Sequence, residues 1–201
     1  MSSFTGADRA RIRIVLGDAN VLYSRVLRDY LLYAADAELI SIRWSAAILS
    51  EVIEHLSANL LAFDAEAGRR LVAAMTAAFP NAEVDIDDAT RQRVAPMALP
   101  DEDDRHVLEA AVAAEAEILR TDNIKDFPTE AMKVVDIQAL TADDLISLLV
   151  MEYGDEMRAV HRTVVSRLPG ATDQSTLAAL RRAGAGRAAG LLMDLLPSSN
   201  A

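Results

Sequence analysis

The sequence predicts an α/β protein in which a parallel sheet of about five strands is flanked by helices and followed by a small all-helical extension. Short apolar segments alternate with amphipathic helical segments up to about residue 150, as in parallel sheets covered on both faces. From residue 142 onward the pattern is purely helical. The length of 201 residues, with 52% hydrophobic content, suffices for one ordinary domain and a small unit. We expect a flexible N-terminus over residues 1–10, an α/β domain over 11–150 and a helical extension over 151–201.

The first half of the chain predicts three strands and three helices. Residues 11–16 are rich in β-branched side chains and stop at a Gly-Asp-Ala-Asn turn, which is typical of a buried strand. Residues 21–35 carry apolar side chains at steps of three and four, which is the spacing of a helix. Ser45 is a suitable N-cap for the helix after the second strand. The expected elements are strands over 11–16, 39–44 and 82–86, and helices over 21–35, from Ser45 to about Leu60, and over 64–79.

The second half predicts two more strands before the extension. A polar, proline-bearing passage leads into an alanine-rich helix that begins near Asp104. Beyond residue 142, one continuous apolar stripe runs to Leu168, with Gly154 as its weak point. The expected elements are a helix over 104–114, strands over 117–121 and 132–137, a loop over 122–128, and helices over 142–168, 177–182 and 188–195.

The charge balance excludes some classes of function. The chain carries 31 acidic and 20 basic residues, which gives a net charge of −11 and a pI near 4.7. This argues against a broad basic surface that grips nucleic acid. Because the chain has no cysteine, a disulfide framework, a thiolate metal site and a cysteine nucleophile are excluded. No apolar run reaches membrane-spanning length, and we expect a cytoplasmic protein with no membrane partner.

Oxygen-bearing side chains from four separate segments fall where strands of the predicted sheet end. Asp18 follows the first strand, Glu51 lies on the helix after the second, and Asp104 begins a later helix. Asn123 and Asp126 lie in the loop after the fourth strand. Ligands bind beyond the carboxyl ends of parallel strands, so we expect these side chains at one site. Because clustered carboxylates repel one another, a cation is expected among them, and oxygen ligands suit Mg²⁺ or Mn²⁺.

A metal site of this kind would suit hydrolysis of a phosphodiester bond, because a bound metal lowers the pKa of water and neutralises developing charge. Each residue alone also has an ordinary interpretation. Asp18 and Asp104 could simply cap helices, and Glu51 could be a partly exposed helix residue. Asn123 and Asp126 could be turn residues. The functional interpretation rests on the combination.

Four motifs carry a family resemblance. They are Val-Leu-Gly-Asp-Ala-Asn-Val-Leu-Tyr over 15–23, Arg-Trp-Ser-Ala-Ala-Ile-Leu-Ser-Glu over 43–51, Leu-Pro-Asp-Glu-Asp-Asp-Arg-His-Val-Leu over 99–108 and Ile-Leu-Arg-Thr-Asp-Asn-Ile-Lys-Asp-Phe-Pro over 118–128. In this order they resemble PIN-domain ribonucleases and, more narrowly, VapC-type toxins of type II toxin–antitoxin modules that carry a helical C-terminal extension. The resemblance covers residues 11–150 well and the tail more loosely.

The resemblance implies an endoribonuclease that depends on Mg²⁺ or Mn²⁺. It places Asp18, Glu51 and Asp104 at the family's acidic positions. Asn123 falls where many members have Asp or Asn, and Asp126 is the acid of an Asp-Phe pair. The resemblance also implies a homodimer, an RNA substrate and a cognate antitoxin protein, which would dock on an apolar groove beside the first two helices and place a side chain near the acidic pocket.

Several neighbouring residues are candidates for supporting roles. Thr121 matches the threonine that closes the family's fourth strand, and it joins Arg105 and Lys125 as a candidate for substrate binding. The two basic side chains could contact RNA phosphates or be solvated surface charges. Asp101 is a candidate for a carboxylate just outside the metal set, and Asp122 could share the role of its neighbour Asn123.

Two other features have a functional and an ordinary interpretation. His106 could touch substrate or be a surface histidine. Arg181, Arg182 and Arg187 give the tail a basic face that could bind RNA or an acidic partner, or could simply be solvated.

Two other functions are compatible with parts of this sequence pattern. A catalytically inactive PIN scaffold would use the same fold only to bind a partner, although the complete set of acids favours a nuclease. A phosphotransfer domain of the receiver or haloacid-dehalogenase type also places an aspartate after the first strand. The sequence Asp18-Ala-Asn20 lacks the second aspartate of a dehalogenase pair.

Overall fold

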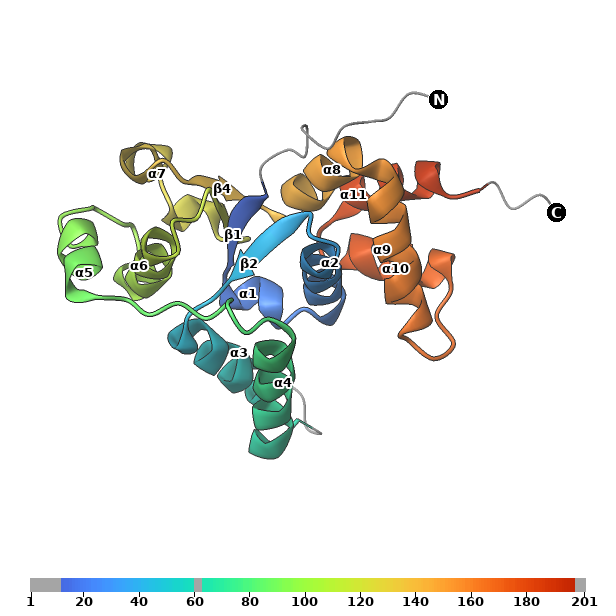
Figure 1. Ribbon diagram of the computed structural model, residues 1–201, viewed down its shortest axis with the longest axis horizontal. Coiled ribbons are helices and arrows are strands. Elements are labelled where there is room, and N and C mark those ends of the chain that lie inside the picture. The colour runs from blue at the N-terminus through green and yellow to red at the C-terminus, as the bar shows by residue number, and fades with distance from the viewer. Residues whose placement is uncertain (1–11, 60–62, 198–201) are drawn as a thin grey trace, which may run out of the picture.

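Four parallel strands form the sheet at the centre of the molecule. The computed structural model describes residues 12–59 and 63–197, and in this part of the chain the strand order is β2-β1-β3-β4 (Figure 1). The predicted α/β class and parallel sheet are confirmed. The flexible N-terminus predicted over residues 1–10 lies outside the described residues. The strands are β1 (Arg13–Gly17), β2 (Ile40–Arg43), β3 (Ile118–Arg120) and β4 (Gln138–Leu140).

The pairing of β1 with β3 sets the position of the site. Gly17, the last residue of β1, pairs with Arg120, the last residue of β3. Just beyond this pair, the Asp18 backbone N–H donates to the Arg120 carbonyl oxygen at 3.0 Å. Parallel strands that end in register bring the residues after them to one edge of the sheet. Asp18 and Thr121 are therefore neighbours, although 103 residues separate them in the sequence.

Helices surround the sheet. Those of the α/β domain are α1 (Ala19–Leu22), α2 (Arg25–Asp36), α3 (Ala46–Asn59), α4 (Ala65–Ala78), α5 (Asp88–Val94), α6 (Arg105–Ala113) and α7 (Thr129–Val135), with 3-10 turns η1 (Glu102–Asp104) and η2 (Ile124–Asp126). The later helices are α8 (Ala142–Glu152), α9 (Gly154–Ser166), α10 (Asp173–Arg182) and α11 (Gly186–Leu195). In Figure 1, α5–α7 and α8–α11 lie on opposite sides of the sheet, and α3 and α4 lie below it. Among the described residues, no helix combines the length and apolar character needed to cross a bilayer.

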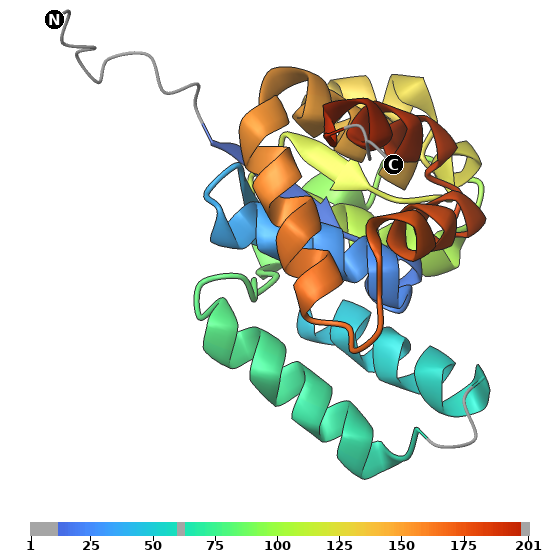
Figure 2. The same cartoon turned by 90° about the vertical axis from the view of Figure 1, so that its right-hand side faces the viewer.

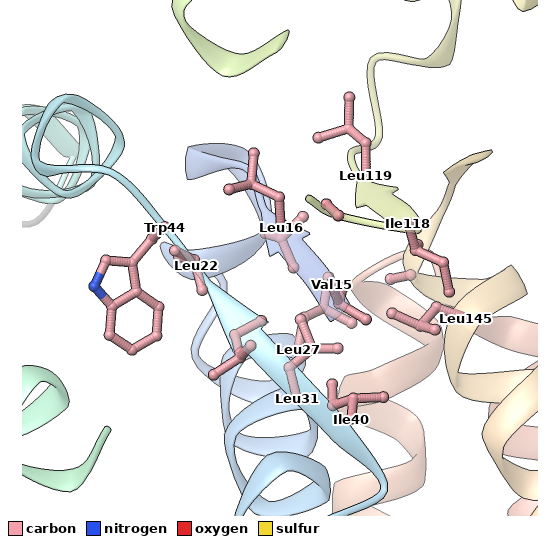
Figure 3. Packing of buried hydrophobic residues seen from close by; sticks show 14 of the residues in the cluster. Val15, Leu16, Leu22, Leu27, Leu31, Ile40, Trp44, Ile118, Leu119 and Leu145 are labelled. Carbon is pink, nitrogen blue, oxygen red and sulfur yellow. The ribbon is translucent and has the colours of Figure 1, made fainter. Parts of the chain in front are cut away.

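The core is built on the two central strands. Val15 and Leu16 of β1 and Leu119 of β3 are fully buried. These strands are covered on both faces, so their adjacent residues are buried together rather than alternating with exposed ones. Leu31 of α2 and Leu145 of α8 pack into the same cluster (Figure 3). One apolar core therefore joins the α/β domain to the helical extension.

Two predicted strands are wrong. Residues 132–137 lie mostly in α7, which ends where Asp136 adopts the left-handed conformation with φ of 57°, and β4 forms only after it. A short apolar run suits a strand or a buried helical turn equally, so the pattern alone cannot decide. Residues 82–86 form no strand, because only an isolated bridge joins Trp44 to Glu83. The sheet consequently has four strands instead of about five.

Helix boundaries also differ from expectation. The helix predicted over 21–35 is divided into α1 and α2, and the stripe from 142 to 168 is divided into α8 and α9 at Tyr153, whose φ of −132° and ψ of 51° are not helical. Helix α5, which was not predicted, begins at an Asp87 N-cap whose carboxylate accepts from the Thr90 N–H at 2.7 Å. The predicted Ser45 cap is confirmed by a 3.3 Å bond from the Ile48 N–H. The expected helix end near Leu60 lies outside the described residues.

The helical extension is held to the α/β domain by buried polar contacts as well as apolar ones. Tyr30 of α2 hydrogen-bonds to Nδ1 of His161 on α9, and Nε2 of His161 lies 3.2 Å from Asp173 at the start of α10. Burial lowers the pKa of His161 and so favours its neutral form. Nδ1 of the neutral ring then accepts the tyrosine proton, while Nε2–H donates to the carboxylate. This chain of contacts fixes α10 relative to α2. The predicted boundary at residue 150 falls within α8, and this division of the chain stays a prediction.

Candidate active site

Asp18 is the buried centre of the site. It follows β1 and is the N-cap of α1, where its Oδ1 accepts from the Ala19 N–H at 2.6 Å. Its Oδ2 accepts from the Thr121 hydroxyl at 2.7 Å and from the Asn20 side-chain amide at 2.9 Å. Burial raises the pKa of Asp18, and the bonds from Thr121 and Ala19 act in the opposite direction. The carboxylate is therefore held in one orientation from two segments that are distant in the sequence.

The Thr121 hydroxyl connects this carboxylate to the following loop. The side chain is fully buried. Its Oγ1 donates to Asp18 and accepts from the Asn123 backbone N–H at 3.0 Å. The Asn20 amide also approaches Oγ1, at 3.3 Å. Thr121 thus positions Asp18, and the substrate contact expected for it stays a prediction.

Asp104 has an acceptor that nothing in the described chain uses. It lies at the junction of η1 and α6, and its Oδ2 is buried without a hydrogen-bond partner. Burial, together with the negative charges of Asp18, Asp126 and Asp101, raises the pKa of Asp104 from 3.8 to about 6. A carboxylate that is costly to ionise, and whose buried oxygen has no hydrogen-bond donor beside it, is a strong candidate for binding a cation.

Glu51 reaches the same region from α3 and is in contact with His106. His106 Nε2 lies 3.0 Å from Glu51 Oε1. The ring's other nitrogen, Nδ1, lies 2.7 Å from the Asp103 carbonyl oxygen, to which it donates. Burial raises the pKa of Glu51, which His106 opposes and the nearby charge of Asp18 reinforces. His106 thus lies within the acidic site. The sequence indicates this placement only through the position of His106, two residues after Asp104.

The loop after β3 contributes residues of different exposure. Asp126 in η2 is buried, and its charge acts on Asp104. The Asn123 side chain is exposed and makes no capping hydrogen bond. Lys125 is exposed and has no ion-pair partner within the described residues. Asp122 is exposed and pairs with the buried Arg120 at 2.8 Å. The structure therefore brings Asp126 into the acidic group and leaves Asn123 at its edge.

Arg105 is engaged elsewhere. Its guanidinium makes two 2.7 Å bonds to Glu102 and donates to the carbonyl oxygens of Val94 and Met97. These contacts tie the start of α6 to the end of α5. The contact of Arg105 with RNA stays a prediction. Glu102 and two carbonyl oxygens already accept hydrogen bonds from this side chain.

The four carboxylates fit a divalent cation in their donor chemistry and their charge. Asp18, Glu51, Asp104 and Asp126 offer hard oxygen donors, the type that Mg²⁺ and Mn²⁺ prefer. The charge of Asp18 acts on both Glu51 and Asp104, and the charge of Asp126 acts on Asp104, which is consistent with the four lying in one region. Over residues 12–59 and 63–197, no three acidic or histidine side chains converge tightly enough to hold a metal ion as they stand. Side chains would have to close around a cation.

Comparison with known proteins gives two matches. The family model described as "PIN domain" matches residues 13–125, more than half of the chain. A protein of Mycobacterium tuberculosis (strain ATCC 25618 / H37Rv) named "Putative ribonuclease VapC50" is 44% identical over 57 residues, which are 28% of this chain and 34% of that protein. The match therefore spans about a third of that relative's length. No solved structure matches the chain significantly.

Proposed function

Because the chain belongs to the PIN domain family, we propose that it is a divalent-metal-dependent endoribonuclease and the toxin of a type II toxin–antitoxin system. The name of its M. tuberculosis relative supports the ribonuclease activity and the VapC assignment. The single observation that carries metal dependence is the buried Oδ2 of Asp104, which has no hydrogen-bond partner among the described residues. The negative charges of two buried carboxylates, Asp18 and Asp126, act on this group.

In this proposal Asp18, Glu51, Asp104 and Asp126 are the catalytic carboxylates, and together with Asn123 they hold Mg²⁺ or Mn²⁺. A divalent cation bound there would lower the pKa of a water molecule and stabilise charge on the phosphorane-like transition state. The chain's own residues prepare the site.

The structure contains three features that would favour cation binding by these carboxylates. Thr121 and Asn20 fix the Asp18 carboxylate through hydrogen bonds of 2.7 and 2.9 Å. His106 Nε2 lies 3.0 Å from Glu51 Oε1 and attracts this carboxylate when the ring is protonated. Asp104 keeps one oxygen that accepts no hydrogen bond from residues 12–59 and 63–197. These contacts orient the carboxylates before the side chains close around a cation.

The substrate and partners follow from the same assignment. Exposed Lys125 lies beside Asp126 and is proposed to contact RNA phosphates, with Arg105 and Thr121 as further substrate-binding candidates. A cognate antitoxin protein, a homodimer and a cytoplasmic location belong to the proposal as well.

The test is metal-dependent cleavage of RNA together with metal binding. Wild-type protein is expected to cleave RNA in Mn²⁺ or Mg²⁺, to stop when EDTA removes the metal, and to resume when Mn²⁺ is restored. Calorimetric titration with Mn²⁺ should show a saturable site that disappears in the Asp18→Asn variant.

Loss of cleavage in Asp18→Asn excludes a contaminating nuclease, and Asp103→Asn, purified in parallel, is the matched control for removal of a carboxylate, since Asp103 is an exposed carboxylate next to Asp104. It should cleave and bind Mn²⁺ like the wild type. Cleavage that continues unchanged in EDTA would contradict metal dependence. Absence of both cleavage and a saturable Mn²⁺ site would favour the inactive scaffold.

A further inference from the structure

A cleft of about 450 Å³ adjoins the acidic site on the side of the helical extension. Its walls come from the turn between α1 and α2, from α3, from the loop after β3 and from the end of α10, and they include Tyr23, His55 and Arg182. The volume is within the roughly 300–1,000 Å³ that small-molecule sites have. Neither Asp104 nor Asp126 lines this cleft, so it is distinct from the acidic site.

One wall residue, Asn20, connects the cleft directly to Asp18. The Asn20 side-chain amide donates to Asp18 Oδ2 at 2.9 Å. Its Oδ1 accepts from the Asp122 backbone N–H at 3.4 Å. His55 lies one helical turn after Glu51 on α3. A ligand in the cleft would therefore be separated from Asp18 by the side chain of Asn20.

The cleft offers an aromatic surface. The rings of Tyr23 and His55 are stacked, with centroids 4.0 Å apart and an angle of 26° between their planes. His55 is exposed and Tyr23 is half-buried. Proteins that bind single-stranded nucleic acid hold bases by stacking them on aromatic side chains of this kind.

The cleft also offers a cation, the Arg182 guanidinium. Arg182 is exposed and makes no hydrogen bond or ion pair within the described residues. The two other arginines of this basic face are engaged: Arg181 contacts the Met193 sulfur, and Arg187 pairs with Asp144. Helix α10, which carries Arg182, packs against α2 beside the start of the domain (Figure 2). A guanidinium is suited to phosphate oxygens and to base edges.

We propose that this cleft is a nucleotide subsite, in which an unpaired nucleotide of the RNA next to the scissile bond stacks on the Tyr23–His55 pair and its phosphate contacts Arg182. This inference rests on the proposed function. It gives the helical extension a role in choosing the substrate, because Arg182 belongs to α10 whereas the acidic site belongs to the α/β domain. The exposed Asp122 carboxylate on the wall does not oppose a phosphate strongly, since Arg120 pairs with it at 2.8 Å.

The kinetic test uses the full-length chain with a fluorescein-labelled single-stranded RNA of mixed sequence in Mn²⁺. Arg182→Ala and His55→Ala are each expected to raise KM roughly tenfold while kcat changes less than about twofold, because they remove contacts that are made equally in the ground state and the transition state. Arg181→Ala is the matched control, since this neighbour faces Met193 and should leave both constants unchanged.

A second readout does not depend on cleavage. RNA that carries 5-iodouridine is irradiated with the Asp18→Asn variant, and the crosslinked peptide is identified by mass spectrometry. The crosslink is expected at Tyr23 and is expected to be lost in Tyr23→Leu.

The outcomes separate this inference from the proposed function. If the wild type cleaves RNA but Arg182→Ala and His55→Ala behave like Arg181→Ala, the subsite is wrong and the nuclease assignment stands. If neither cleavage nor a crosslink occurs, both are wrong. If Arg182→Ala loses binding of a protein partner and keeps its KM for RNA, the cleft is a protein docking site and the subsite is wrong.

Discussion

Replacing Asp104 by asparagine is expected to lower the rate of RNA cleavage by at least about 100-fold and, at the same time, to raise the melting temperature of the metal-free protein. The first effect follows from losing a carboxylate of the acidic site whose buried Oδ2 accepts no hydrogen bond from the described residues. The second follows from the price of ionising that group, because burial and three neighbouring aspartates raise the pKa of Asp104 from 3.8 to about 6. An asparagine of nearly the same shape carries no charge.

The effect of Asp104→Asn on stability is expected to depend on pH. A carboxyl group with a raised pKa binds its proton more tightly in the folded protein, so its ionisation costs stability as pH rises. The cost is absent below about pH 4 and complete above about pH 6. Asp104→Asn should therefore stabilise the metal-free protein at pH 7.5 and have little effect at pH 4. Thermal unfolding in EDTA at both pH values measures this.

Asp103→Asn is the matched control for this experiment, since it removes one negative charge at the adjacent, exposed position. We expect it to preserve cleavage and to change the melting temperature by less than Asp104→Asn does. If Asp103→Asn abolished cleavage and Asp104→Asn did not, the catalytic carboxylate would be Asp103 and not Asp104.

Replacing Thr121 by valine is expected to lower kcat by roughly 10- to 100-fold with little change in KM, and to lower the free energy of unfolding by about 1–3 kcal/mol. Valine keeps the shape but removes a hydroxyl that donates to Asp18 at 2.7 Å and accepts from the Asn123 N–H at 3.0 Å. The bond from Thr121 lowers the pKa of Asp18, so its loss should also move the acidic limb of the pH–rate profile to higher pH.

Thr121→Ser separates positioning from substrate contact. Serine retains the hydroxyl, and we expect it to restore most of kcat and the position of the acidic limb. Denaturant unfolding and steady-state kinetics on the two variants are sufficient. A rise in KM at unchanged kcat in Thr121→Val would instead identify Thr121 as a substrate-binding residue.

The proximity of the acidic side chains was more predictable from the sequence than the number of strands was. Asp18 and Asp126 follow strands that end in register at one edge, so the order of the motifs was enough to place them together. Residues 132–137 illustrate the opposite case, because a short apolar run carries no information on whether it forms a strand or the helical turn seen in α7.

What the sequence could not provide are contacts that depend on tertiary packing. Arg105 and Lys125 are equivalent as basic neighbours of acids, yet the first is bound by Glu102 and two carbonyl oxygens and the second is exposed. Likewise, Arg181 and Arg182 are adjacent, and only the docking of α10 against α2 determines which of them lines the cleft. The pairing of His106 with Glu51 depends on the approach of α6 to α3 in the same way.

The most direct test of the central claim is the location of Mn²⁺ by anomalous scattering in crystals of the wild-type protein. We expect a peak bounded by Asp18, Asp104 and Asp126, with these carboxylates drawn closer together than in the metal-free chain, and no peak there in crystals of Asp104→Asn. Crystals saturated with Mn²⁺ that show no ion at this position, or an ion only at another position, would contradict the account.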